Sequence, residues 1–141
     1  MPYKHGWFLE SRIFYNEYWG DVTAEEIRQL AEFNLEYLDH SDAPLVHAFI
    51  NIEAMGSFPV NLSALRDSTL TTLRHPKMGW LIAYGKNNRF VSFLIPLVTQ
   101  LFQTRYRLFD TYEEAVAFLQ SVDTSLPDLG SPDVPESKEA P

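Results

Sequence analysis

Apolar residues along this chain follow two periods, one typical of strands and one typical of helices. Residues 7–19 are rich in aromatic and β-branched side chains with polar residues between them, which predicts two short strands joined near residues 10–12. Residues 45–52 form a nearly continuous apolar run, which is typical of a strand that is covered on both faces. Two shorter runs predict further strands, at 80–84 and 106–109.

Helical spacing separates and follows these strands. Thr23 and Glu26 form a capping box, and the same signature returns at Thr111 and Glu114, so each pair predicts the start of a helix. The predicted helices cover residues 24–39, residues 61–75, residues 89–103 and the segment that follows Thr111, with Ala115, Phe118, Leu119 and Val122 on its core face.

The resulting order is β-β-α-β-α-β-α-β-α, which predicts an α/β domain. Because strands that alternate with helices require crossover connections, we expect a mixed, mostly parallel sheet of five strands with about four helices packed on it. This domain covers residues 1–125. Residues 126–141 hold four prolines and four acidic residues against one lysine, which predicts a disordered acidic tail.

Composition narrows the range of functions. The chain has no cysteine, which excludes disulfides, thiolate catalysis and cysteine-ligated metal centres. Its net charge of −8 disfavours binding to nucleic acid, whose phosphates attract Lys and Arg. No apolar run is long enough to span a membrane and the first residues do not resemble a signal segment, so we expect a cytoplasmic protein without stable membrane association.

The histidines offer little support for catalysis or metal binding. Their spacing fits no known metal motif, and the sequence contains no nucleophile elbow, phosphate loop or dinucleotide-binding turn. His47 lies within a predicted strand, where a lone histidine is typically a core residue bonded to the backbone. His75 is predicted to end a helix. We therefore expect no enzyme, no metal and no cofactor, and an enzyme that used His47 or His75 would require a polar cleft around them.

The predicted helix 89–103 is the most unusual segment, because between residues 90 and 102 only three residues are polar. Its apolar arc is wider than the face of about 100° that covers a sheet. One stripe can face the core, and the adjoining one then forms a surface for a partner or a ligand. The candidate residues for this contact are Phe90, Phe93, Leu94, Leu97, Val98, Leu101 and Phe102.

Three explanations of that second stripe remain open. It could form the seam of a homodimer, since two-fold dimers are the commonest oligomers. It could line a groove for a small apolar or lipid-like ligand, with Phe58, Trp80 and Tyr84 as further lining. Finally, neighbouring helices and the N-terminal aromatic residues could cover it completely.

Several short motifs accompany the element order. They are Tyr18-Trp19-Gly20-Asp21-Val22-Thr23, Val46-His47, His75-Pro76-Lys77-Met78-Gly79-Trp80, and Arg105-Tyr106-Arg107 before Glu113-Glu114-Ala115. From residue 7 to about 123 the chain resembles the STAS domain, and more closely the small bacterial SpoIIAA-like (STAS/CRAL-TRIO-like) family. The resemblance implies a serine that is phosphorylated after the central strand. Here Ser57 and Ser63 are the candidates, although the Asp-Ser pair of regulatory members is absent.

The sequence thus favours a non-catalytic STAS-like interaction or regulatory module, homodimeric through residues 90–102 and able to bind a protein partner. The alternative is a carrier or sensor that holds a small apolar or lipid-like ligand beside that helix.

Overall fold

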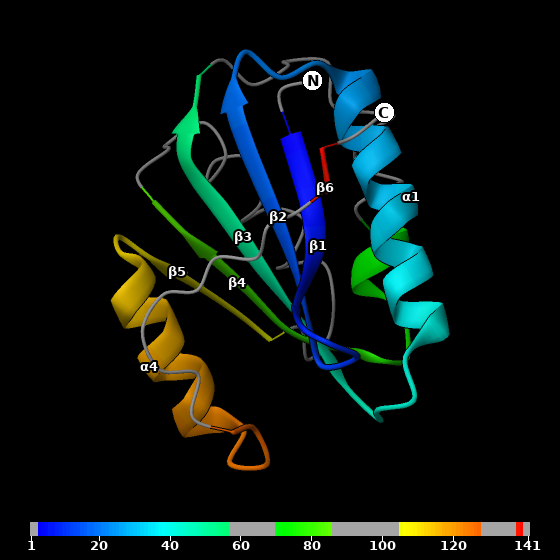
Figure 1. Cartoon of the computed structure of the whole chain (residues 1–141), viewed down its shortest axis with the longest axis vertical. Helices are drawn as coiled ribbons and strands as arrows, with labels where there is room; N and C mark the ends of the chain where they lie inside the picture. Colours follow the sequence, from blue (N-terminus) through cyan, green and yellow to red (C-terminus); the bar gives the residue numbers. More distant parts are fainter. Residues whose placement is uncertain (1–2, 57–69, 86–104, 128–137, 140–141) are drawn as a thin grey trace.

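The computed structural model describes residues 3–56, 70–85, 105–127 and 138–139, which form an α/β fold around one mixed sheet (Figure 1). Its strands are β1 (Tyr3–Leu9), β2 (Ile13–Gly20), β3 (Val46–Met55), β4 (Met78–Tyr84), β5 (Tyr106–Phe109) and β6 (Lys138–Glu139). They lie in the order β5-β4-β3-β2-β1-β6. The β1–β2 hairpin is antiparallel, whereas β2, β3, β4 and β5 are parallel neighbours.

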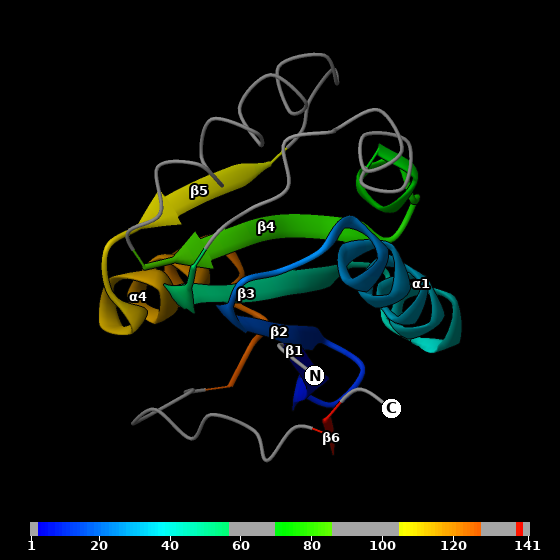
Figure 2. The same cartoon turned by 90° about the horizontal axis from the view of Figure 1, so that it is seen from above.

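Helices cover both faces of the sheet, as Figure 2 shows from above. The long helix α1 (Ala24–His40) and the helical residues 70–73 lie on one face. Helix α4 (Tyr112–Val122) lies on the other face, against β3, β4 and β5. Because side chains alternate across a strand, β3 contributes to a core on each side.

Each face of the sheet therefore has its own hydrophobic core. Towards α1, Ala48 and Ile50 of β3 pack with Leu30 and Leu38 of the helix. Towards α4, Phe49 packs with Tyr15, Ile82, Tyr84, Tyr112 and Leu119. His47 points to this second side, at the end of the sheet where β3 begins. The polar site described below thus borders the core that α4 closes.

The structure confirms the predicted hairpin, its turn and both capping signatures. Arg12 N–H donates to the Leu9 carbonyl (3.0 Å), and Ser11 between them has a positive φ of 63°. The hydroxyl of Thr23 accepts from the Glu26 amide, and that of Thr111 accepts from the Glu114 amide.

Some predicted boundaries and one face are wrong. The first strand begins at Tyr3 rather than at residue 7, because Tyr3 to Trp7 pair with β2 although polar residues interrupt their apolar pattern. Likewise β3 continues to Met55, beyond the predicted strand at residues 45–52. Val122 was assigned to the core face of the last helix, yet it is 39% exposed because α4 ends there, beyond the edge of its core.

Other predictions fall wholly or partly outside the described residues. Of the helix predicted at 61–75, only residues 70–75 are described, and 70–73 of these are helical. The helix predicted at 89–103 is not described, so the count of four helices stays a prediction. Within the predicted tail, Lys138–Glu139 pair antiparallel with Lys4 and His5 of β1. Among the described residues, no helix combines the length and the apolar character that crossing a membrane requires.

Candidate functional site

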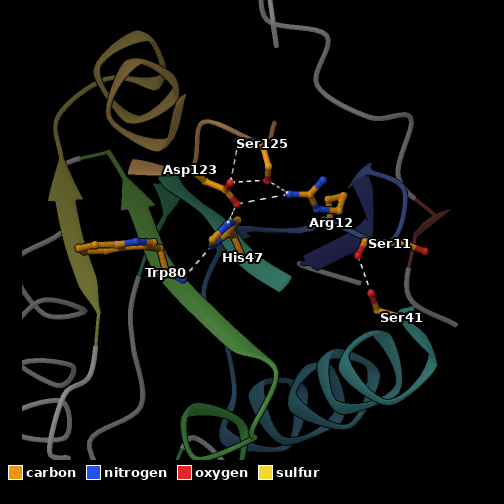
Figure 3. Close-up of polar contacts among 7 residues, drawn as sticks. All are labelled: Ser11, Arg12, Ser41, His47, Trp80, Asp123 and Ser125. Atoms are coloured by element: carbon orange, nitrogen blue, oxygen red, sulfur yellow. Dashed lines mark hydrogen bonds and ion pairs between the residues drawn. The ribbon is translucent and has the colours of Figure 1, made fainter. Parts of the chain in front are cut away.

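Polar side chains gather where the parallel strands begin (Figure 3). Arg12 immediately precedes β2, His47 is the second residue of β3, Trp80 lies near the start of β4, and Arg105 immediately precedes β5. The ladder holds these starts in line, because His47 N–H donates to the Arg12 carbonyl and Leu81 N–H to the Arg105 carbonyl, both at 2.9 Å. The C-terminal end of α4 reaches the same edge and adds Asp123.

His47 is 1% exposed, and both of its ring nitrogens are engaged. The backbone N–H of Trp80 donates to Nδ1 (2.9 Å), so Nδ1 carries no proton. Nε2 must then carry the proton of the neutral ring, and it donates that proton to Oδ2 of Asp123 at 2.8 Å. The ring therefore links β3 to β4 and to the end of α4. This confirms the expectation of a core histidine that is bonded to the backbone.

The environment keeps His47 neutral. Burial lowers the pKa of His47 below its ordinary value, and the hydrogen bond to Asp123, which acts in the opposite direction, does not offset this. A second proton on Nδ1 would also face the Trp80 N–H, so that two donors would point at each other. For Asp123, burial acts to raise the pKa, but the hydrogen bonds from His47 and Ser125 outweigh it and lower that pKa to about 2.

Asp123 is the centre of this network. Its second oxygen, Oδ1, accepts from the Ser125 hydroxyl (2.5 Å) and from the Ser125 amide (3.1 Å). Arg12 Nη2 donates to the Ser125 hydroxyl at 2.6 Å and lies 3.4 Å from Asp123 Oδ2 (Figure 3). One carboxylate thus fastens the end of α4 to the β1–β2 turn and to β3. It forms these links across 76 residues to His47 and 111 to Arg12.

Gly79 makes room for the buried ring. A Cβ atom at this position would lie 2.5 Å from Nδ1 of His47 and 3.3 Å from the carbonyl of Val46. Neither neighbour can move freely, because the ring is held at both nitrogens and the carbonyl belongs to the backbone. Gly79 therefore leaves the space for the ring, and Trp80 supplies the backbone N–H that donates to it.

A pocket of about 340 Å³ opens beside this network. Its polar lining consists of Arg12, His47, Arg105, Asp123 and Ser125, and Trp80 adds an aromatic side chain. The ring of Trp80 contacts Phe118 of α4 edge to face (5.0 Å between centroids) and lies beneath the Arg107 guanidinium (5.6 Å). A half-open space with guanidinium, imidazole and indole groups is suited to ligand binding.

His75 is arranged in the same way at the surface. Lys77 N–H donates to its Nδ1 (3.1 Å), and its Nε2 lies 2.7 Å from Oδ1 of Asp39, the carboxylate near the end of α1. Here the histidine side chain is 16% and the aspartate side chain 65% exposed.

The structure separates the predicted ligand-lining residues. Trp80 borders the pocket, whereas Tyr84 is 2% exposed and lies inside the second core, against Phe49 and Tyr112. The remaining candidates lie outside the described residues: Ser57, Phe58, Ser63 and the helix contact set Phe90, Phe93, Leu94, Leu97, Val98, Leu101 and Phe102.

Sequence reasoning missed Arg12, Asp123 and Ser125 as members of one site. They are single polar residues far apart in the chain, and no motif joins them. For Arg12 a signal was nevertheless present: in a parallel sheet the amino ends of neighbouring strands meet at one edge, so polar residues just before several predicted strands converge there. Asp123 and Ser125 follow a helix and gave no such signal.

Among the described residues, no group of three or more histidine and carboxylate side chains is placed to hold a metal ion. No protein-family model matches the chain, and comparisons with curated proteins and with solved structures find no significant similarity.

Proposed function

We propose that this chain is a non-catalytic regulatory module of the STAS-like type, which acts by binding a protein partner and forms a homodimer through residues 90–102. The proposal that the module is non-catalytic rests on the burial and the hydrogen-bond partners of His47. Its ring is buried, and a backbone donor and a carboxylate occupy its two nitrogens. A general base needs a nitrogen within reach of a substrate proton, and this histidine offers none.

The distribution of charge supports a role in binding. The solvent-facing side of α1 carries exposed acidic residues, among them Glu25, Glu32 and Glu36. At β5, which ends the sheet order, Arg105 just before the strand and Arg107 within it are exposed. Opposite charges on separate elements can orient an approaching partner and favour one docking geometry over others.

The homodimer can be tested with two pairs of charge substitutions. L97E/L101E changes one apolar stripe of the segment 90–102, and V98E/F102E changes the adjoining one. A glutamate at a core position unfolds the domain, whereas a glutamate at the seam separates folded subunits. We therefore expect one pair, and only one, to give a folded monomer by sedimentation equilibrium and circular dichroism.

A matched control places the same charges elsewhere. A117E/S121E has the same spacing of four residues on α4, where both positions are exposed, and it should stay dimeric. The proposal fails if the wild-type protein is monomeric at all concentrations, or if neither pair of substitutions in residues 90–102 gives a folded monomer.

The alternative of a carrier for an apolar ligand beside residues 90–102 stays a prediction from the sequence. Of its three further lining residues, Tyr84 is enclosed in the core and Phe58 is outside the described residues.

A further inference from the structure

The pocket beside His47 has an excess of positive charge. Its described lining contains two guanidinium groups, those of Arg12 and Arg105, against the single carboxylate of Asp123. His47 adds no charge, because its Nδ1 accepts a hydrogen bond from Trp80 N–H. The described lining therefore has a formal charge of +1, which one negative charge on a ligand would neutralise.

The two arginines differ in the partners that their side chains have among the described residues. Arg12 donates from Nη2 to Ser125 and Asp123. In the part of the chain that the structure describes, the side chain of Arg105 has no hydrogen-bond or ion-pair partner, and it is exposed at the mouth of the pocket. Because a guanidinium presents a planar fork of donors, Arg105 is free to bind a carboxylate through two parallel hydrogen bonds.

An apolar rim lies next to these cations. Val122 is 39% exposed, and it borders the pocket together with Pro44 and Leu45. Covering such a rim removes apolar surface from water, which favours a ligand with an apolar body.

We propose that this pocket is a binding site for a small monoanionic carboxylate with an apolar body. The carboxylate pairs with the fork of Arg105 and is attracted by Arg12. The body lies against Val122, Leu45 and Trp80, which border the same space. A dianionic phosphate fits less well, because Asp123 repels the second negative charge and the described lining offers no further unpaired cation. This site goes beyond the proposed role in protein binding, and it does not depend on dimerisation.

Benzoate is a suitable probe, since it joins one carboxylate to a flat apolar ring. We expect it to shift the NMR resonances of Trp80 and Val122 in a saturable way, with a dissociation constant on the order of 10 mM for a ligand of this size. Benzamide has the same shape without the charge, and acetate has the charge without the ring. Each should bind at least about tenfold more weakly than benzoate, as should inorganic phosphate.

Arg105→Gln tests the assigned cation. Among the described residues, Arg105 contributes to the fold only through its backbone carbonyl, which accepts from Leu81 N–H, so we expect the variant to keep the wild-type melting temperature. We expect it to weaken benzoate binding at least about tenfold. Arg74→Gln is the matched control, because Arg74 is exposed and does not line the pocket; it should bind benzoate like the wild type.

Three results would overturn the assignment. The first is that benzoate causes no saturable shift of Trp80 and Val122. The second is that benzamide, acetate or phosphate binds as tightly as benzoate, which would remove the requirement for a single charge joined to an apolar body. The third is that Arg105→Gln and Arg74→Gln have equal effects, which would place the anion elsewhere.

Discussion

The His47–Asp123 and His75–Asp39 pairs have the same hydrogen-bond pattern in two different environments. In each pair a backbone N–H donates to Nδ1, and Nε2 lies within 3 Å of a carboxylate oxygen. The side chains of His47 and Asp123 are 1% and 19% exposed, whereas those of His75 and Asp39 are 16% and 65% exposed. Water therefore competes for the partners of the outer pair more readily than for those of the inner pair.

This difference shows that the pattern alone does not determine what a histidine–carboxylate pair contributes. At the surface, water competes for both partners and salt screens their charges. In the interior, a donor or acceptor that loses its partner stays unsatisfied, which costs about 1–3 kcal/mol. We therefore expect the inner pair to stabilise the junction of β3, β4 and α4, and the outer pair to contribute little.

The largest expected effect is that of Asp123→Ala. It leaves the buried Nε2–H of His47 without an acceptor and Arg12 without a counter-charge, so unfolding should become easier by about 2–3 kcal/mol. Urea denaturation followed by circular dichroism measures this change. Asp123→Asn keeps an acceptor for His47 and should lose less. Equal losses in the two variants would mean that the hydrogen bond to His47 contributes nothing.

Gly79→Ala should have the next largest effect, about 1–3 kcal/mol, because the added Cβ would overlap the ring of His47. A double-mutant cycle with His47→Ala isolates this contact. We expect the cost of the alanine at position 79 to fall when the ring is removed. A cost that is the same in both backgrounds would assign it to the backbone of Gly79 instead.

The pH dependence of stability should reveal the contribution of His47. Because the pKa of His47 is lowered in the folded state, the unfolded chain binds more protons below its ordinary pKa, and stability falls as the pH falls. The slope contributed by one such group is at most about 1.4 kcal/mol per pH unit. The lowered pKa of Asp123 adds a further loss as the pH falls from about 4 towards 2.

The variants for this measurement are His47→Gln and His75→Gln. Denaturation curves between pH 7 and pH 5 should show that His47→Gln lacks the slope due to His47. The His75→Gln variant should keep that slope. If His47→Gln has the wild-type slope, proton uptake by His47 does not limit stability in this range.

The smallest effect should be that of Asp39→Ala. The exposed carboxylate of Asp39 can be replaced by water at His75, so the expected loss is below about 1 kcal/mol. Urea denaturation at low and at high salt measures it. A loss as large as that of Asp123→Ala would show that exposure does not distinguish the two pairs.

The elements of the fold could be predicted wherever a local signal was strong. The N-cap residues Thr23 and Thr111 determine where two helices begin, and the apolar run around Phe49 predicts a central strand. Tyr3 to Gly6 gave no such signal, because Tyr3 is followed by two polar residues and a glycine, and this end of β1 is held by pairing with β2.

The site was less predictable, because its contacts join residues that are distant in the sequence. The position of His47 indicated a core residue, but its partner Asp123 follows another helix 76 residues later. An aspartate directly after a helix is common and has no specific meaning by itself. Only the position of α4 on the sheet brings this carboxylate to the ring, and no local pattern encodes that position.

The most direct test of this account is the protonation state of His47. Long-range ¹H–¹⁵N correlation spectra distinguish Nδ1–H, Nε2–H and doubly protonated rings. We predict the Nε2–H tautomer at neutral pH, and a pKa for His47 below the ordinary value of histidine. An Nδ1–H tautomer, or a ring already charged at neutral pH, would contradict the account, since Nδ1 would then not be the acceptor of the Trp80 N–H.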